Sequence, residues 1–292
     1  MKRKLSLNYW TLGGFDGQVP LRTALNQAHA MGWQALELAF GAGELARTPS
    51  ESECTALRHY ADKLGMPFIT MASGAYWTQS LSHPDASVRA LAVEFTKEYL
   101  KTAAMLGVKT ILVVPGHVAV PWDAGQPVVP YDKAWQWSQE SLRHCIGLAE
   151  KLDVTIGLEN VWNWFLADPV AMRSFIDELG STHVGAYFDI GNCLINGYPE
   201  HWISLLASRI KAVHVKNFQR SDCGGKIQGF GESLLTGDAQ WPAILGALDE
   251  INYTGPLTVE MIPFCRLPNL NLPDKPLAAT MLSELNTIVG SV

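Results

Sequence analysis

The chain has 292 residues, of which 22 are basic and 28 acidic, and almost half are apolar. This length and composition predict a folded protein with a sizeable core and exclude a largely disordered chain. The formal charge of −6 argues against a nucleic-acid or anionic membrane partner, because either would require a basic face. No apolar run approaches the ~20 residues of a membrane span, and the first residues are too polar for a signal-peptide core.

The cysteines are odd in number and none stands in a C-x-x-C pair: Cys54, Cys145, Cys193, Cys223 and Cys265. We therefore expect free thiols in a reducing compartment, not a disulfide framework or a zinc knuckle. Together with the polar first residues, this pattern predicts a cytoplasmic protein.

Short apolar runs alternate along the chain with longer stretches of helical period. The runs predict eight strands, at 5–10, 35–40, 67–72, 110–114, 155–159, 184–189, 210–215 and 256–261. The longer stretches predict helices at 21–31, 50–65, 85–106, 131–152, 168–179, 199–208, 238–252 and 278–288. Gly32 and Gly107 mark helix ends, and Ser50 is a candidate N-cap with Glu51 and Glu53 in the first turn.

Regular alternation of strands and helices implies parallel strands joined by helical crossovers. An open doubly wound sheet and a closed barrel both satisfy this pattern. The count of eight strands, and a length near the ~250 residues typical of the barrel, favour the barrel. No G-x-G-x-x-G follows the first strand, which weakens the dinucleotide-binding alternative. We therefore predict an α/β fold, a single (β/α)₈ TIM barrel domain over residues 1–292.

Four successive predicted strands end in a residue of the kind that binds hard metal ions: Glu159, Asp189, His214 and Glu260. Because the carboxyl ends of all strands meet on one face of a barrel, we expect these side chains to lie together. Three carboxylates there would repel one another, and a divalent cation removes that cost. Each residue alone has an ordinary alternative, such as a helix cap, a turn residue or a structural ion pair. Their joint pattern predicts a site for Mn²⁺, Mg²⁺ or Co²⁺.

The segments that contain these residues are G-L-E-N, Y-F-D-I-G-N, V-H-V-K-N and L-T-V-E-M. They resemble the xylose-isomerase-like superfamily of sugar phosphate isomerases and epimerases, which includes the ketose 3-epimerases. The resemblance is densest over 156–261. It implies one divalent ion, commonly Mn²⁺ with Mg²⁺, Co²⁺ or Zn²⁺ as alternatives, held by the four residues named above. It also implies a sugar or sugar phosphate as substrate and a homodimer or homotetramer.

The resemblance also implies a reaction at the carbon beside a ketone. A divalent ion on the carbonyl and neighbouring hydroxyl oxygens stabilises the enediolate that remains when the proton leaves this carbon. Inverting the carbon needs a base on one face and an acid on the other. We therefore predict that Glu159 and Glu260 are the acid/base pair of an epimerase or aldose–ketose isomerase, while Asp189 and His214 are mainly ligands.

The predicted substrate contacts are Arg220, His117, Asn192, Trp122 and Trp162. Arg220 stands six residues after His214, where ketose 3-epimerases carry a substrate-holding arginine; a solvated charge is the alternative. His117 follows the fourth strand and is either a hydroxyl contact or a structural histidine. Tryptophan faces suit the C–H face of a sugar, although some of the loop tryptophans are expected only to pack loops together: Trp10, Trp77, Trp122, Trp162 and Trp164. Glu37 and Lys216 are candidates for the surroundings of the ligands.

The chain departs from the ketose 3-epimerase pattern at three positions. Asn192 stands where a histidine is usual, Phe165 replaces an acidic residue and Asn217 replaces a frequent aspartate. These differences do not affect the four predicted metal ligands, but because of them the substrate is not predicted to be that of the ketose 3-epimerases. The glycine-rich stretch 223–237 also leaves a phosphate-binding loop open.

Three other functions compete with the epimerase hypothesis. A dehydratase of a cyclic polyol ketone such as an inosose uses the same scaffold and would produce an absorbing enone. An abasic-site endonuclease shares the barrel but needs a three-zinc cluster with more histidines at strand ends, whereas several histidines here fall on predicted helices: His29, His59, His144 and His201. A non-catalytic sugar binder would have no need of an acid/base pair.

Overall fold

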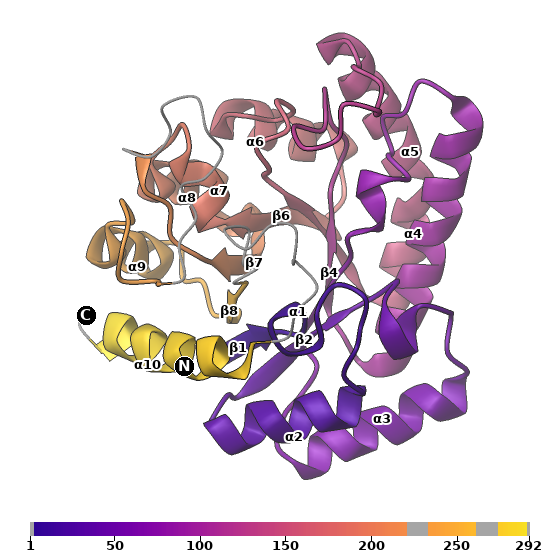
Figure 1. Ribbon diagram of the computed structural model, residues 1–292. Coiled ribbons are helices and arrows are strands. Elements are labelled where there is room, and N and C mark those ends of the chain that lie inside the picture. The colour runs from indigo at the N-terminus through magenta and orange to yellow at the C-terminus, as the bar shows by residue number, and fades with distance from the viewer. Residues whose placement is uncertain (1–2, 221–232, 261–273, 291–292) are drawn as a thin grey trace.

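The computed structural model describes residues 3–220, 233–260 and 274–290. Parallel strands close into a barrel in the sequence order β1 to β8 (Figure 1). The strands are β1 Leu5–Asn8, β2 Ala35–Ala39, β3 Thr70–Ala72, β4 Thr110–Val113, β5 Thr155–Glu159, β6 Val184–Asp189, β7 Ile210–Val215 and β8 Leu257–Val259. The prediction of a (β/α)₈ barrel is confirmed.

The helices surround the barrel and cover its outer surface (Figure 1). They are α1 Trp10–Gly13, α2 Leu21–Met31, α3 Glu51–Lys63, α4 Ala86–Leu106, α5 Tyr131–Leu152, α6 Pro169–Leu179, α7 Ile190–Leu194, α8 Pro199–Leu206, α9 Trp241–Glu250 and α10 Lys275–Gly290. Short 3₁₀ turns lie at Gly43–Leu45, Ala75–Trp77 and Ala207–Arg209. The last helix, α10, packs against α1, α2, α9 and β1 and so joins the two ends of the ring.

Local signals account for most of the helix boundaries. Ser50 and Glu53 form a reciprocal capping box at the start of α3, and Gly107 ends α4 in the left-handed conformation with φ 79°. Helix α9 begins at Trp241, three residues later than predicted. The reason is that the Asp238 carboxylate accepts a hydrogen bond from a backbone amide of the loop after β7 and does not cap the helix.

The first strand is shorter than predicted, because Trp10 begins helix α1. The side-chain oxygen of Asn8 accepts a hydrogen bond from the Trp10 amide at 2.8 Å, and Tyr9 already has helical angles (φ −56°, ψ −33°). Helix α7 was not predicted. It follows β6 directly, and the Asp189 carboxylate caps it by accepting from the Asn192 amide at 2.7 Å.

The pairing register of neighbouring strands determines which side chains lie at the same level along the barrel axis. Asp189 pairs with His214 across β6 and β7, and Glu159 pairs with Tyr187 across β5 and β6. The strands are buried along almost their whole length, as expected when helices cover the outside and side chains fill the inside. Charged side chains at these strand ends are therefore withdrawn from water.

Two smaller expectations concern cysteines and membranes. The cysteines among the described residues are buried free thiols: Cys54, Cys145 and Cys193. Cys223 and Cys265 lie outside the described residues. In the described part of the chain, no helix combines the length and apolar character needed to cross a membrane.

Candidate metal centre

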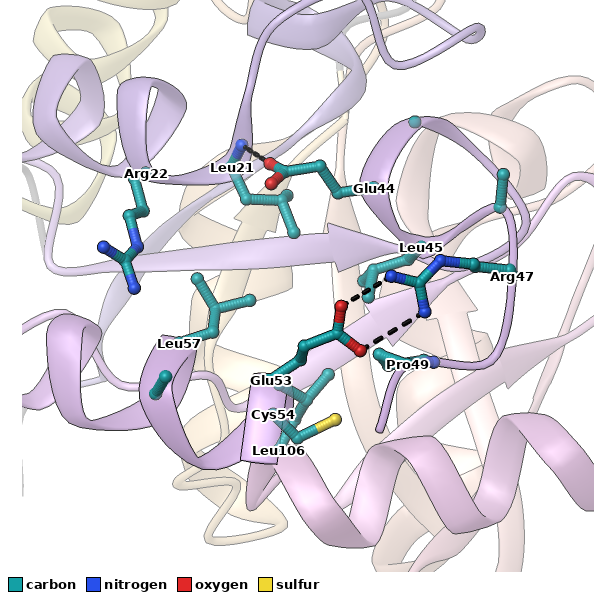
Figure 2. Close-up of a pocket in the computed structure, with 13 residues that line it drawn as sticks. Leu21, Arg22, Glu44, Leu45, Arg47, Pro49, Glu53, Cys54, Leu57 and Leu106 are labelled. Atoms are coloured by element: carbon teal, nitrogen blue, oxygen red, sulfur yellow. Dashed lines mark hydrogen bonds and ion pairs between the residues drawn. The ribbon is translucent and has the colours of Figure 1, made fainter. Parts of the chain in front are cut away.

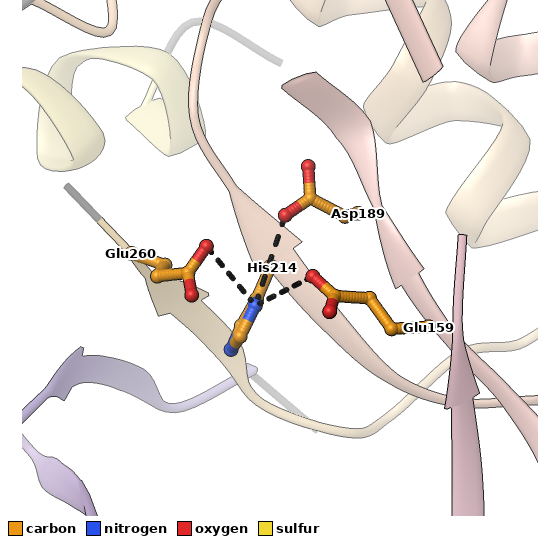
Figure 3. A group of neighbouring side chains, drawn as sticks. All are labelled: Glu159, Asp189, His214 and Glu260. Atoms are coloured by element: carbon orange, nitrogen blue, oxygen red, sulfur yellow. Dashed lines mark ion pairs between the residues drawn. The ribbon is translucent and has the colours of Figure 1, made fainter. Parts of the chain in front are cut away.

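The four predicted ligands converge at the carboxyl end of the barrel (Figure 3). One ligand atom from each of Glu159, Asp189, His214 and Glu260 lies within 4.8 Å of the others, and all four residues are buried. The Nδ1 atom of His214 is central: it lies 3.9 Å from Glu159 Oε1, 3.7 Å from Asp189 Oδ2 and 3.6 Å from Glu260 Oε2. Three carboxylates and one imidazole thus face a common point from four consecutive strand ends.

Two asparagines hold the ends of β5 and β6 in place. The Asn160 side chain bonds both the amide and the carbonyl of Asp189, at 2.8 and 2.9 Å. Asn192 donates from Nδ2 to Asn160 O at 3.0 Å and to Glu159 Oε1 at 3.3 Å. Asp189 therefore uses Oδ1 to cap α7 and turns Oδ2 toward the centre. The sequence offered a signal for Asn160, since both β5 and β6 are followed closely by asparagine, but no role was predicted for it.

The side of His214 away from the ligands is also occupied. Its Nε2 lies 2.7 Å from Oε1 of Glu37, which is fully buried inside β2. Glu37 also accepts hydrogen bonds from Tyr187 Oη and, at 2.7 Å, from Asn8 Nδ2. The expectation that Glu37 lies beside the candidate ligands agrees with this geometry, whereas no sequence pattern pointed to Asn8 or Tyr187.

A lysine is part of the same cluster. The Lys216 Nζ atom lies 2.9 Å from Asp189 Oδ2 and donates to Glu260 Oε2 at 2.5 Å. Its aliphatic stem crosses Gly191, where a Cβ atom would come within 2.3 Å of Lys216 Cγ. Glycine at this position therefore leaves the space through which the ammonium group reaches the carboxylates.

Burial and mutual charge shift the pKa values of the cluster. Burial raises the pKa of Glu159 to about 7, and repulsion by Glu260 and Asp189 adds to this. Burial likewise raises the pKa of Asp189. Burial opposes a charged His214, but attraction to Glu37 and Glu260 outweighs it and holds the imidazole pKa well above its ordinary value. Without a metal ion, the cluster therefore retains protons that a bound cation would displace.

The donor set fits a divalent metal ion. His214 Nδ1 and Asp189 Oδ2 are buried and accept or donate no hydrogen bond within the described residues, although Lys216 forms an ion pair with Asp189. Polar atoms buried in this way need a partner. Three carboxylates are balanced in charge by Lys216 and one divalent cation. Oxygen donors with a single imidazole suit Mn²⁺, Mg²⁺ or Co²⁺.

Among the predicted substrate contacts, Arg220 is held by hydrogen bonds, whereas His117 is buried without a hydrogen-bond partner among the described residues. The Arg220 guanidinium donates to Leu194 O at 2.9 Å and Gly197 O at 2.8 Å, and lies over the Tyr198 ring. It therefore ties the loop after β7 to the end of α7 and the segment that follows, and is not a solvated charge. His117 is buried, and both its ring nitrogens are unpartnered among the described residues. Burial lowers its pKa to about 4, so the ring is neutral.

Tryptophans from three successive loops meet edge to face at the same end of the barrel as the candidate ligands. Trp122 lies between Trp77 and Trp162, with ring centroids 4.6 and 4.8 Å away. The loops after β4 and β5 are also joined by a hydrogen bond from the Val118 amide to Asn163 O at 3.1 Å. Trp122 remains 47% exposed, so this tryptophan cluster is partly open to solvent.

The other aromatic predictions fall elsewhere. Trp10 packs against Phe15 with a centroid distance of 4.8 Å, as expected of a loop-packing residue. Phe165 is buried against Phe175 of α6, so the side chain at this position is part of the core. The glycine-rich stretch that left phosphate binding open lies largely outside the described residues, at 221–232.

A separate cavity of about 630 Å³ lies on the outer side of the barrel between α2 and α3 (Figure 2). Its charged groups are engaged locally: Arg47 pairs with Glu53, and Glu44 accepts a hydrogen bond from the Leu21 amide. None of the four metal ligands lines it. This cavity is therefore distinct from the metal centre.

Comparison with known proteins gives sequence relatives at low identity. An uncharacterized protein of Methanocaldococcus jannaschii, MJ1311, is 25% identical over 207 residues, which cover 70% of this chain and 65% of that protein. D-psicose 3-epimerase of Enterocloster bolteae is 24% identical over 266 residues, which cover 89% and 82% of the two chains. The prediction that the chain is an enzyme agrees with this relative and is confirmed.

A solved structure and a family model agree with the fold. The crystal structure of a D-psicose 3-epimerase in the presence of D-fructose superposes with a TM-score of 0.78 at 19% identity, covering 98% of this chain and 99% of the other. The model of the family described as xylose isomerase-like TIM barrel matches residues 25–281. This match spans most of the chain, and the chain belongs to the xylose isomerase-like TIM barrel family.

Proposed function

We propose that this chain is a divalent-metal-dependent sugar epimerase that inverts the carbon beside the ketone of a ketose. The observation that carries the proposal is the convergence of Glu159, Asp189, His214 and Glu260, buried and within 4.8 Å of one another. The named sequence relative, a D-psicose 3-epimerase, supports the same class of reaction. Aldose–ketose isomerisation begins with the same kind of proton removal but returns the proton to the neighbouring carbon, and the same experiment tests it.

The four residues would hold the ion through three carboxylates and His214 Nδ1, and Mn²⁺ is the ion we propose. When bound, the cation would polarise the substrate carbonyl and stabilise the negative charge that develops beside it. Lys216 supplies a further positive charge at Asp189 and Glu260. Asn160 and Asn192 keep the ends of β5 and β6 in position, so the ligands need little rearrangement when the ion arrives.

Glu159 and Glu260 are the proposed acid/base pair. They approach the centre from opposite sides of the His214 ring (Figure 3), as inversion of a carbon between them requires. One glutamate removes the proton from one face, and the other returns a proton to the opposite face.

The substrate contacts are proposals that rest on position. Asn192 Oδ1 is buried and unpartnered in the described residues, and its Nδ2 already touches Glu159, so a substrate hydroxyl beside this glutamate would complete its hydrogen bonding. Trp122 and Trp162 offer aromatic faces at the same barrel end. Arg220 and His117 complete the proposed contacts. We propose a free or phosphorylated ketose, since nothing among the described residues selects between them.

The experiment is a substrate panel in deuterated water. Ketopentoses, ketohexoses, their phosphates and an inosose are incubated with the Mn²⁺-loaded protein, and the products are analysed by chromatography, ultraviolet absorbance and NMR. An epimerase incorporates deuterium at the carbon beside the ketone and changes only its stereochemistry. An absorbing enone from an inosose would instead identify a dehydratase. Absence of both exchange and turnover across the panel would refute the proposal.

The assembly and the location remain proposals as well. We propose a homodimer or homotetramer, as the family resemblance implies, and a cytoplasmic location, as the cysteine pattern predicts. Light scattering behind size-exclusion chromatography measures the assembly directly, and a monomer at micromolar concentration would contradict it.

A further inference from the structure

A buried carboxylate outside the ligand set lies against the metal centre. Glu37 is in the middle of β2, inside the barrel, and has no exposed surface. Its Oε1 atom receives hydrogen bonds from His214 Nε2 and Asn8 Nδ2, both at 2.7 Å, and its Oε2 atom receives one from Tyr187 Oη. Three strands, β1, β6 and β7, thus direct a donor at one carboxylate.

This arrangement determines which nitrogen of His214 carries a proton when the other binds a metal ion. An ionised carboxylate can only accept hydrogen bonds, so Nε2 must be the donor in the contact with Glu37. The Nδ1 atom then presents its lone pair on the opposite side of the ring. That atom is the one 3.6–3.9 Å from the three ligand carboxylates, and it has no hydrogen-bond partner within the described residues.

The ring is also held in orientation. Tyr187 packs against the His214 imidazole at a centroid distance of 4.6 Å with an interplanar angle of 63°, while its hydroxyl group bonds Glu37. The same tyrosine therefore restrains the ring and the carboxylate that faces it. Rotation of the imidazole would break the Nε2 hydrogen bond and this ring contact together.

We propose that Glu37 is a positioning residue of the metal centre, which holds His214 as the Nε2–H tautomer with Nδ1 directed at the ion. The inference rests on the proposed metal centre and extends it to the surroundings of one ligand. A buried carboxylate is costly, and an apolar residue of similar size would be cheaper in a barrel core. The three hydrogen-bond donors compensate for the cost of burying Glu37, and the arrangement leaves His214 Nδ1 oriented to bind a metal ion.

Glu37→Gln separates the proposal from a purely structural role. Glutamine has nearly the same shape, but its amide can either accept from or donate to Nε2, so it no longer enforces one tautomer. We expect Mn²⁺ affinity, measured by calorimetry on the folded metal-free protein, to fall about 10- to 100-fold. Glu140→Gln, the same change on the exposed face of α5, is the matched control, and its Mn²⁺ affinity is expected to equal that of wild type.

The tautomer itself is measured by ¹⁵N NMR of the imidazole in wild-type protein loaded with Zn²⁺, which is diamagnetic. We expect a protonated Nε2 and a metal-bound Nδ1. Glu37→Asp, which keeps an acceptor-only group, is expected to retain more affinity than Glu37→Gln. A metal-bound Nε2 in wild type, or unchanged affinity in Glu37→Gln, would overturn the proposal and leave the metal centre standing. Failure of wild type to bind any divalent ion would instead refute the proposed function.

Discussion

The Lys216 ammonium group lies 2.5 Å from Oε2 of Glu260 and 2.9 Å from Oδ2 of Asp189, so a fixed positive charge is built into a cluster of buried carboxylates. Burial opposes a charged lysine, but attraction to these carboxylates outweighs it and raises the Lys216 pKa. The lysine is therefore charged in the metal-free protein. Together with one divalent cation, it balances the three ligand carboxylates.

Lys216→Met is expected to destabilise the metal-free protein far more than the metal-loaded protein. Removing one partner of a buried ion pair typically costs about 3–5 kcal/mol, and a divalent cation would replace much of the lost attraction. Urea denaturation in EDTA and in Mn²⁺ measures both free energies of unfolding. Lys211→Met is the control, since this lysine lies at the start of β7 and donates to Ser208 O, whereas Lys216 follows the end of that strand. Equal losses in both conditions would contradict the charge-balance argument.

Glu159→Gln and Glu260→Gln are each expected to lower kcat by at least about 10²- to 10⁴-fold, because each removes one of the two groups that transfer the proton. Circular dichroism and metal analysis should show a folded protein that still binds metal, since the amide oxygen remains a ligand. Glu140→Gln, on the exposed face of α5, is the control and should leave kcat unchanged.

Solvent exchange gives the sharper form of this test. If the two glutamates serve opposite faces, each variant should still exchange deuterium into one epimer of the substrate but not into the other, and the two variants should differ in which epimer exchanges. Normal kcat in either variant would remove that glutamate from the acid/base role.

The convergence of the four candidate ligands could be predicted from the sequence, because each stands at or near the end of a short apolar run and the barrel gathers strand ends at one face. The bounds of β5, β6 and β7 coincide with their predicted ranges, and these strands carry Glu159, Asp189 and His214. In these strands the apolar pattern of the sequence and burial in the barrel favour the same residues. In β1 the apolar pattern extends to Trp10, but the Asn8 side chain accepts a hydrogen bond from the Trp10 amide and the strand ends at Asn8.

The surroundings of the ligands could not be predicted in the same way. Glu37 meets Tyr187 across 150 residues and His214 across 177, and only the closure of the barrel determines these contacts. Arg220 illustrates a second limit. Its hydrogen bonds go to backbone carbonyls of Leu194 and Gly197, whose directions depend on the path of the loop and not on residue type.

Metal-dependent stabilisation is expected to increase with pH. In the metal-free protein the pKa of Glu159 is raised to about 7 and that of His214 well above 6.5, so the folded state binds more protons than the unfolded state. Stability from these groups is fully present below their unfolded pKa values and is lost as the pH rises through the folded values. A bound cation takes the place of these protons and removes the loss.

The measurement is the difference in Tm between Mn²⁺-loaded and EDTA-treated protein from about pH 5 to about pH 8. The difference should widen across this range. Asp189→Asn removes one ligand carboxylate and should reduce the widening. A difference that is constant or narrows with pH would show that the centre does not exchange protons for metal.

Trp122 is expected to contribute to substrate affinity more than to stability. Its ring is 47% exposed between Trp77 and Trp162, so removing it exposes little core but takes away an aromatic face near the ligands. Trp122→Ala should raise KM by roughly two- to tenfold, the equivalent of about 0.5–1.5 kcal/mol of aromatic contact, while kcat and Tm change little. Tyr131→Ala, an exposed aromatic residue at the start of α5, is the control. If Trp122→Ala lowers Tm by several degrees and leaves KM unchanged, the tryptophan cluster packs the loops together and does not contact the sugar.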